Sequence, residues 1–222
     1  MKTTLLCNAG LALHHNGETL LIDLPNRAEN VFYRLPDDFW TNICDCRSPY
    51  EKISGICFTH THGDHFDKER LLDFTTRYPD VPCFVPKDLN DDGIFKMGIF
   101  TIEYHRFPHA PIDNAPPHVV FVISAGEKQI YIAADAALDC EIHRKIINGR
   151  YMDAAFWTPM YLSRQETRTL LKETASKNVI YHMPVKTEEC GIWKKCENNF
   201  KRYPDQLDTV LVPDRYPTEI IL

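Results

Sequence analysis

The sequence predicts an α/β fold in which two mixed β-sheets pack against each other and helices flank them. Three observations lead to this prediction: short apolar runs arranged as antiparallel hairpins, helical segments between other apolar runs, and no repeat or Gly/Ser linker within the 222 residues. Hairpins together with helix-linked strands are typical of packed sheets flanked by helices. Because nothing divides the sequence, we expect a single domain over residues 1–222.

The chain opens with a predicted antiparallel hairpin. Its apolar runs, 11–13 and 19–23, lie on either side of Asn16-Gly17, and Asn-Gly is a strong signal for a hairpin turn. Residues 24–50 then lose periodicity and contain three prolines, which indicates a long loop with room for a helical turn. Loops of this length usually have a function.

A strand, a helix and a second strand follow. Residues 53–59 are rich in β-formers, 68–77 have helical spacing, and 81–85 form another short apolar run. The helix residues expected to face the core are Leu71, Leu72 and Phe74.

The second half of the chain again combines hairpins with helices. Further strands are expected at residues 99–107, 118–124, 129–133, 153–157, 179–182, 209–212 and 219–222. Helices are expected at residues 138–148, 164–176 and 190–203.

Composition excludes several classes of protein. Apolar residues make up 44% of the chain and charged residues 25%, which is ordinary for a globular protein. The net charge of −6 argues against a partner such as nucleic acid, whose nonspecific binding depends on Lys and Arg. The apolar run at residues 1–7 is too short for a signal peptide, and no stretch is long enough to span a membrane. We therefore expect a cytoplasmic protein with no membrane partner.

Eight cysteines are scattered along the chain. In a chain of this size without a secretion signal we expect them to stay reduced. The pairs Cys44/Cys46 and Cys190/Cys196 leave a structural metal or a regulatory disulfide open, although neither has the two-residue gap typical of zinc knuckles.

The strongest chemical signal is the segment 59–67, Thr-His-Thr-His-Gly-Asp-His-Phe-Asp, between a predicted strand and a predicted helix. Imidazole nitrogen and carboxylate oxygen are ligands that zinc-like cations prefer, and two histidines at i and i+2 in extended backbone can converge at a strand end. Without a cation, such a loop would gather uncompensated polar groups for no benefit. The candidate ligands in this segment are His60, His62, Asp64 and His65.

The pattern His60-x-His62-x-Asp64-His65 after a strand resembles the signature of the metallo-β-lactamase superfamily. The resemblance covers essentially the whole chain. It implies an αββα sandwich with two metal ions at one edge, and three further ligands from later strand ends in the order His, bridging Asp, His.

His109 is the best match to the first of these later ligands, because it follows one predicted strand and precedes another. His105 and His118 are its competitors. His105 lies inside the predicted strand 99–107, where packing is a more usual role, and His118 begins the next strand.

Asp135 and His182 match the remaining two ligands of the superfamily. Asp135 ends the strand-like run 130–134, and His182 ends the run 179–181. The sequence departs from the superfamily at Ala136, where Thr or Ser is usual.

The resemblance distributes these ligands over two divalent cations, zinc first, with manganese or iron as alternatives. One cation would be bound by His60, His62 and His109 and the other by Asp64, His65 and His182, with Asp135 and a water bridging them. Two cations would lower the pKa of the bridging water from about 15.7 toward neutrality and so provide hydroxide as the nucleophile. Asp64 is the candidate catalytic residue, which would orient the water or carry its proton.

The resemblance implies a hydrolase and leaves the substrate open among phosphodiesters, thioesters, lactams and lactones. The bridging Asp and the closing segment 209–222 are similar to the phosphodiesterase branch, which includes tRNA 3′-end-processing endonucleases. We therefore expect a phosphodiesterase or related esterase. The alternatives are a thioesterase or lactonase, a mononuclear iron sulfur dioxygenase, and a non-catalytic binding module.

A small molecule is the expected substrate, because no long tRNA-gripping arm is evident and the chain is acidic. A homodimer is left open. Rim residues that could contact a substrate, or simply be surface charges and packing aromatics, are Arg27, Tyr33, Arg34, Arg106, Arg164 and Lys186.

Overall fold

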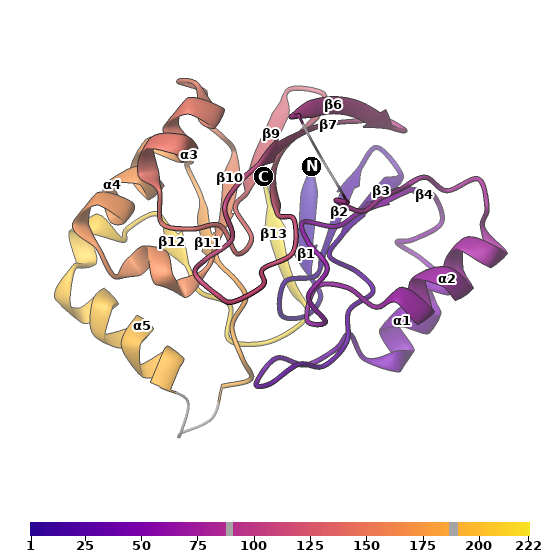
Figure 1. Ribbon diagram of the computed structural model, residues 1–222, viewed down its shortest axis with the longest axis horizontal. Coiled ribbons are helices and arrows are strands. Elements are labelled where there is room, and N and C mark those ends of the chain that lie inside the picture. Colours follow the sequence, from indigo (N-terminus) through magenta and orange to yellow (C-terminus); the bar gives the residue numbers. More distant parts are fainter. Residues whose placement is uncertain (88–90, 187–190) are drawn as a thin grey trace.

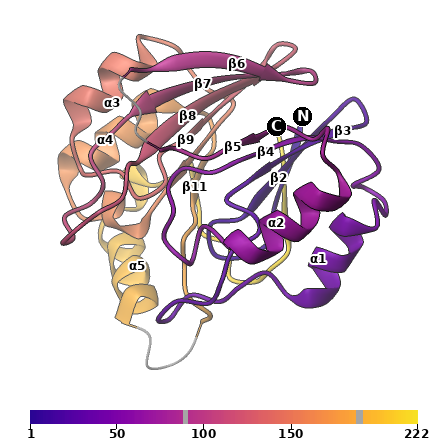
Figure 2. The ribbon, with the colours of Figure 1, turned by 45° about the vertical axis from the view of Figure 1, so that its right-hand side comes forward.

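The computed structural model describes residues 1–87, 91–186 and 191–222. Within these ranges two β-sheets face each other, and helices cover their outer faces (Figures 1 and 2). The predicted architecture of two mixed sheets flanked by helices is confirmed. The helices are α1 (Asp37–Cys44), α2 (Lys68–Arg77), α3 (Cys140–Ile147), α4 (Gln165–Thr174) and α5 (Gly191–Arg202), with short 3-10 turns η1 (Pro159–Leu162) and η2 (Pro204–Gln206).

The first sheet has the strand order β13-β1-β2-β3-β4-β5 in the described residues. Its antiparallel part ends with the predicted hairpin of β2 and β3, and β4 and β5 then add in parallel. Its strands are β1 (Lys2–Leu5), β2 (Leu11–His15), β3 (Glu18–Ile22), β4 (Ile53–Cys57), β5 (Cys83–Phe84) and β13 (Thr218–Ile221).

The second sheet has the strand order β12-β11-β10-β9-β8-β7-β6. Strands β6 to β9 are antiparallel, and β9 to β12 are parallel because helices connect them. Its strands are β6 (Gly93–Met97), β7 (Phe100–Arg106), β8 (Val119–Ala125), β9 (Lys128–Ile132), β10 (Ala154–Trp157), β11 (Asn178–Ile180) and β12 (Val210–Leu211).

The core has three layers because the central strands are buried on both faces. In β3, Leu20 and Ile22 lie between the sheets, whereas Leu21 packs under α1 and α2. In β8, Ile123 lies between the sheets and Val122 packs on the side of α3, α4 and α5. Such strands are near-continuous apolar runs rather than alternating ones, which is how they appear in the sequence.

The structure corrects three predictions about elements. The strand β1 precedes the opening hairpin, β6 precedes the strand predicted at 99–107, and α1 is an eight-residue helix inside the region expected to be a loop. The predicted inward position of Leu72 is wrong: this side chain is 62% exposed, whereas Leu71 and Phe74 are buried. No helix in the described ranges combines the length and apolarity needed to cross a bilayer.

Candidate metal centre

The predicted ligands come together at one edge of the sandwich, where loops leave β4, β9 and β11 and where β7 is connected to β8. Backbone hydrogen bonds fix these loops against one another, and two of the three bonds below join one sheet to the other. The three bonds are Val119 N to Thr59 O (2.9 Å), Ala110 N to Asp135 O (2.6 Å) and His182 N to Asn8 O (2.8 Å). The edge therefore collects residues that are more than 100 positions apart in sequence.

The loop after β4 has a short turn that leads directly into α2. The amides of His65 and Phe66 both donate to the carbonyl of His62, and the Asp67 carboxylate caps α2 by accepting from the amides of Glu69 and Arg70. The turn thus places Asp64 and His65 beside His60, with all three buried.

The seven predicted ligands form two groups, and in each group the candidate ligand atoms lie within 4.8 Å of one another. The first group contains His60, His62, His109 and Asp135, and the second contains Asp64, His65 and His182. In the second group, His182 Nε2 lies 2.9 Å from His65 Nε2 and 3.0 Å from Asp64 Oδ2.

Asp135 lies between the two groups. Its Oδ2 is 3.5 Å from His109 Nε2 and 3.8 Å from His60 Nε2, while its Oδ1 is 3.4 Å from His182 Nε2. One carboxylate therefore faces both sets of imidazoles, which is the position that the resemblance assigned to the bridging ligand.

The donor atoms fit divalent cations. His60 Nε2, His109 Nε2 and Asp135 Oδ1 are buried and have no hydrogen-bond partner among the described residues, an expensive arrangement unless another group binds them. His109 Nδ1 donates to the Ala110 carbonyl at 2.7 Å, so Nε2 is the ring nitrogen left to bind a cation. Imidazoles held in this way are typical metal ligands.

The charges in the cluster also favour cations. Burial opposes ionisation of Asp135, yet the charges of His182 and His65 hold the pKa of its carboxyl well below the ordinary value. Burial likewise opposes a charged His65, but Asp23 and Asp135 raise its pKa. Burial lowers the pKa of His60 well below its ordinary value, so this ring is neutral. The cluster thus combines ionised carboxylates with a protonated His65, and a cation bound at His65 Nε2 would take the place of that proton.

Three buried residues that the sequence analysis did not identify support the ligands. The Asp23 carboxylate accepts from Thr59 N (2.7 Å), Thr59 Oγ1 (2.8 Å) and His65 Nδ1 (2.9 Å). Asn8 and Asn26 both donate to the Asp64 carbonyl, at 3.3 and 3.1 Å. Asp23 follows an apolar strand, the same sequence signal by which Asp135 was found.

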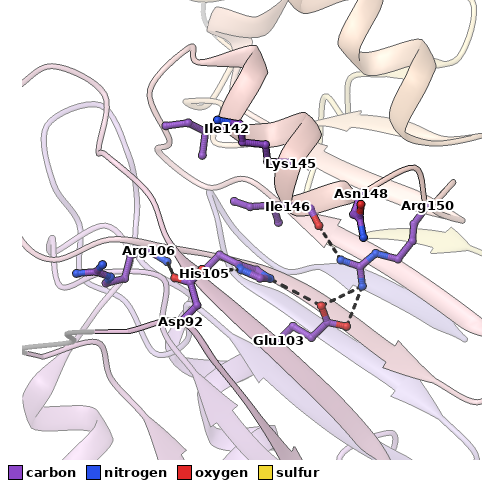
Figure 3. Close-up of a pocket in the computed structure, with 9 residues that line it drawn as sticks. All are labelled: Asp92, Glu103, His105, Arg106, Ile142, Lys145, Ile146, Asn148 and Arg150. Carbon is purple, nitrogen blue, oxygen red and sulfur yellow. Dashed lines mark hydrogen bonds and ion pairs between the residues drawn. The ribbon is translucent and has the colours of Figure 1, made fainter.

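His105 and His118, the competitors of His109, lie outside both groups. His105 lies in a different pocket, where it contacts Asp92 and Glu103 and where Glu103 forms an ion pair with Arg150 (Figure 3). His118 is buried next to the site, with its ring centroid 5.3 Å from that of His60, and burial lowers its pKa to about 3.

The cysteine pairs give no metal site in the part of the chain that the structure describes. Cys44 and Cys46 are free thiols, and Cys46 Sγ lies 3.5 Å from the Tyr78 hydroxyl. Cys196 is buried in α5, and Cys190 lies outside the described residues.

A cavity of about 870 Å³ opens onto the cluster, and we call it the site cavity. Its lining includes His62, Asp64, His109, Asp135 and His182. Of the six rim residues considered from the sequence, Arg164 lines this cavity. This volume is within the range of small-molecule sites.

No protein-family model matches the sequence, and the comparison with curated proteins gives no match. Solved structures do match. An isothiocyanate hydrolase from Delia radicum gut bacteria has 16% identity and a TM-score of 0.67, and the match covers 100% of this chain and 99% of that one. A possible metal-dependent hydrolase from Veillonella parvula has 14% identity and a TM-score of 0.68 over the same shares of the two chains. The metallo-β-lactamase fold protein YhfI from Bacillus subtilis has 13% identity and a TM-score of 0.67 over all of both chains.

These likenesses cover the whole length of the chain, and they agree with the two-sheet architecture described above. The chain therefore has the metallo-β-lactamase fold. The expectation drawn from the motif at residues 59–67 is confirmed at the level of the fold.

Proposed function

We propose that this protein is a metal-dependent hydrolase that binds two divalent cations and cleaves a phosphodiester or a related ester of a small molecule. The observation that carries the proposal is the position of Asp135 between two groups of ligand atoms. Three donors lie on either side of Asp135, and this is the number and type that zinc ions use while leaving room for water or substrate. Zinc is the first candidate, and manganese and iron have the same ligands available.

Bound cations would supply a water that is acidic enough to react at neutral pH, together with polarisation of the substrate oxygen. The residues of the chain would position the reaction. Asp64 Oδ2 lies 3.4 Å from Asn8 Nδ2 and 3.0 Å from His182 Nε2. Burial opposes its charge, but the hydrogen bond from His182 lowers the pKa of the carboxyl, so Asp64 is ionised and can orient a water or accept its proton.

Substitution of ligands tests the proposal. With zinc or manganese added, His62→Ala and Asp64→Ala should each lower the turnover of bis(p-nitrophenyl) phosphate by at least about 100-fold. Even mutation of a residue that only hydrogen-bonds to a metal ligand lowers metal affinity or activity by about 10–100-fold. His105→Ala is the matched control, since this histidine lies in the separate pocket of Figure 3. Full activity of either ligand variant, with circular dichroism like that of the parent, would place the chemistry elsewhere.

A substrate panel separates hydrolysis of phosphodiesters from the alternatives. It contains phosphodiesters, thioesters and lactones, and also an aryl isothiocyanate, because one similar structure is an isothiocyanate hydrolase. A thioesterase or lactonase would show its highest kcat/KM on its own class of ester.

Metal analysis tests the two remaining alternatives. One equivalent of iron in protein from unsupplemented medium, with oxygen uptake, would indicate a dioxygenase. Failure to bind zinc or manganese in calorimetry would indicate a non-catalytic binding module. A cytoplasmic location remains part of the proposal, to be tested by fractionation. Light scattering decides whether the protein is a homodimer, which the sequence leaves open.

A further inference from the structure

One face of the C-terminal helix α5 forms part of the wall of the site cavity. Ile192, Lys195, Cys196 and Asn199 line the cavity, and their spacing of three, one and three residues places them on one side of the helix. The neighbouring Trp193 is buried, and its Nε1 donates to the Pro184 carbonyl at 2.9 Å. This bond helps to hold α5 in its position beside the cluster.

Much of the remaining lining is apolar and accessible. Met160, in η1, is 40% exposed, and Ile112, in the loop between β7 and β8, is 49% exposed. Phe32 and Leu138 also line the cavity, and the Phe32 ring lies edge-on to His182 with centroids 4.2 Å apart. Large apolar side chains that remain accessible beside polar ligands are typical of a surface that binds an apolar group.

Charge is unevenly distributed around this apolar surface. The carboxylates of the lining, Asp64, Asp135 and Glu29, lie in the metal cluster or next to its loop: a Cβ on Gly63 would come within 2.5 Å of Glu29 Oε2. The two basic residues of the lining come from other elements: Arg164 lies at the start of α4, and Lys195 lies on α5. Neither side chain forms an ion pair with any residue in the described ranges.

Thr158 adds a polar group to the lining. It precedes η1 at the N-cap position, yet its hydroxyl makes no cap hydrogen bond. The side chain is buried, at 4% exposure, and its Oγ1 has no partner among the described residues. An unpaired buried hydroxyl costs free energy unless a ligand or water binds it.

From these features we infer that the substrate has an apolar body and an anionic end: the scissile ester lies at the metal cluster, the body contacts Met160 and Ile112, and the anion binds Arg164 and Lys195. This inference rests on the proposed function and specifies its substrate class. A charge-assisted hydrogen bond is stronger than a neutral one, so the anion should increase affinity about tenfold over a neutral group of the same size. Thr158 donates a further hydrogen bond to the bound molecule.

A kinetic experiment uses two p-nitrophenyl phosphodiesters that differ only at the end of the second alcohol, which is a pentanoate in one and a pentanamide in the other. In both, a P–O bond forms from water and the P–O bond to p-nitrophenolate breaks. With zinc, the parent protein should have a kcat/KM about tenfold higher for the carboxylate. Arg164→Met and Lys195→Met should each remove most of this preference for the carboxylate over the amide.

Lys194→Met is the matched control, because Lys194 is the exposed neighbour of Lys195 on α5 and does not line the cavity. It should retain the preference for the carboxylate. Loss of the preference in Lys194→Met as well would indicate general electrostatic attraction rather than a site, and would overturn the inference.

A binding experiment gives a readout that needs no turnover. Calorimetry on the zinc-free protein compares 4-phenylbutanoate with 4-phenylbutanamide, and the parent should bind the acid about tenfold more tightly. Arg164→Met and Lys195→Met should remove that difference. Thr158→Val should weaken binding of both probes, and Thr158→Ser, which keeps the hydroxyl, should restore it.

The two experiments distinguish failure of this inference from failure of the proposed function. Cleavage of both phosphodiesters at equal rates, with equal binding of both probes, would leave the hydrolase intact and overturn the substrate class. A preference for the acid in binding that depends on Arg164 and Lys195, without cleavage of either diester, would support the anion site and contradict the phosphodiesterase.

Discussion

His143 in α3 should make the stability of this protein strongly dependent on pH. The side chain is completely buried, with Nδ1 2.6 Å from the Tyr131 hydroxyl and Nε2 2.6 Å from the Tyr161 hydroxyl. The Tyr161 hydroxyl donates to the carbonyls of Ala137 (3.1 Å) and Ala136 (3.3 Å), so it accepts from Nε2–H, and Nδ1 accepts from Tyr131. A neutral ring satisfies this network, and a second proton on Nδ1 would break it.

The size and sign of the effect follow from the pKa. Burial lowers the pKa of His143 from its ordinary value of 6.5 to about 3. Between these values the unfolded chain binds a proton that the folded chain does not, so the free energy of unfolding falls by about 1.4 kcal/mol for each unit that the pH decreases. From pH 7.5 to pH 5 the loss is about 2 kcal/mol, a large part of the roughly 5–15 kcal/mol by which proteins are stable.

Urea unfolding in EDTA at pH 7.5 and pH 5 measures this loss. His143→Phe should have a lower free energy of unfolding at pH 7.5, because two tyrosine hydroxyls lose a partner, but it should lose about 2 kcal/mol less than the parent on acidification. If His143→Phe does not fold, the same measurement is made on His143→Gln, whose side chain keeps a hydrogen-bond donor and an acceptor. His15→Gln, at the end of β2, is the control. Equal losses in parent and His143 variants would refute the argument.

Three further predictions concern the site and the core. Asp23→Asn should weaken zinc binding about 10–100-fold in competition with a chromophoric chelator, whereas Asp153→Asn, at a carboxylate that binds Lys128, should not; equal affinities would contradict the role of Asp23. Phe74→Ala should cost about 3–5 kcal/mol in urea unfolding and Leu72→Ala less than about 0.5, and a reversed order would contradict the burial assigned here. Zinc at 100 times its Kd should raise the free energy of unfolding of EDTA-treated protein by about 2.7 kcal/mol, and an unchanged melting temperature would argue against a bound cation.

Local patterns were sufficient to predict much of this fold. The helix α2 has the predicted bounds because apolar spacing, the Asp67 cap and the following strand all agree. The opening hairpin was predicted from Asn16-Gly17, whose two residues both have positive φ, as its tight turn requires. The motif at residues 59–67 was visible because its ligands are close in sequence.

The missed elements lack such signals. The strand β1 (Lys2–Leu5) contains two threonines and becomes buried only through pairing with β2 and β13. In the edge strand β6, Phe95 and Met97 pack against the core, but Ile94 on the other face is 66% exposed, so the apolar and polar residues do not alternate in the sequence. The helix α1 begins after Pro36 with no side-chain cap and buries two residues, Trp40 and Ile43. In each case tertiary contacts outweigh weak local preference.

The support of the candidate site is harder to predict for a further physical reason. Asp23, Ala134 and His182, at three strand ends around the cluster, have φ values of 52°, 48° and 57°. A sequence-based argument expects glycine at such positions, because other residues pay about 1–3 kcal/mol there. Here long-range bonds compensate: Asp23 accepts three hydrogen bonds, one of them from His65, and His182 N donates to the Asn8 carbonyl at 2.8 Å. The residue types of a metal site can therefore be predicted from spacing, whereas the sharp turns that aim them depend on partners that only the folded chain brings together.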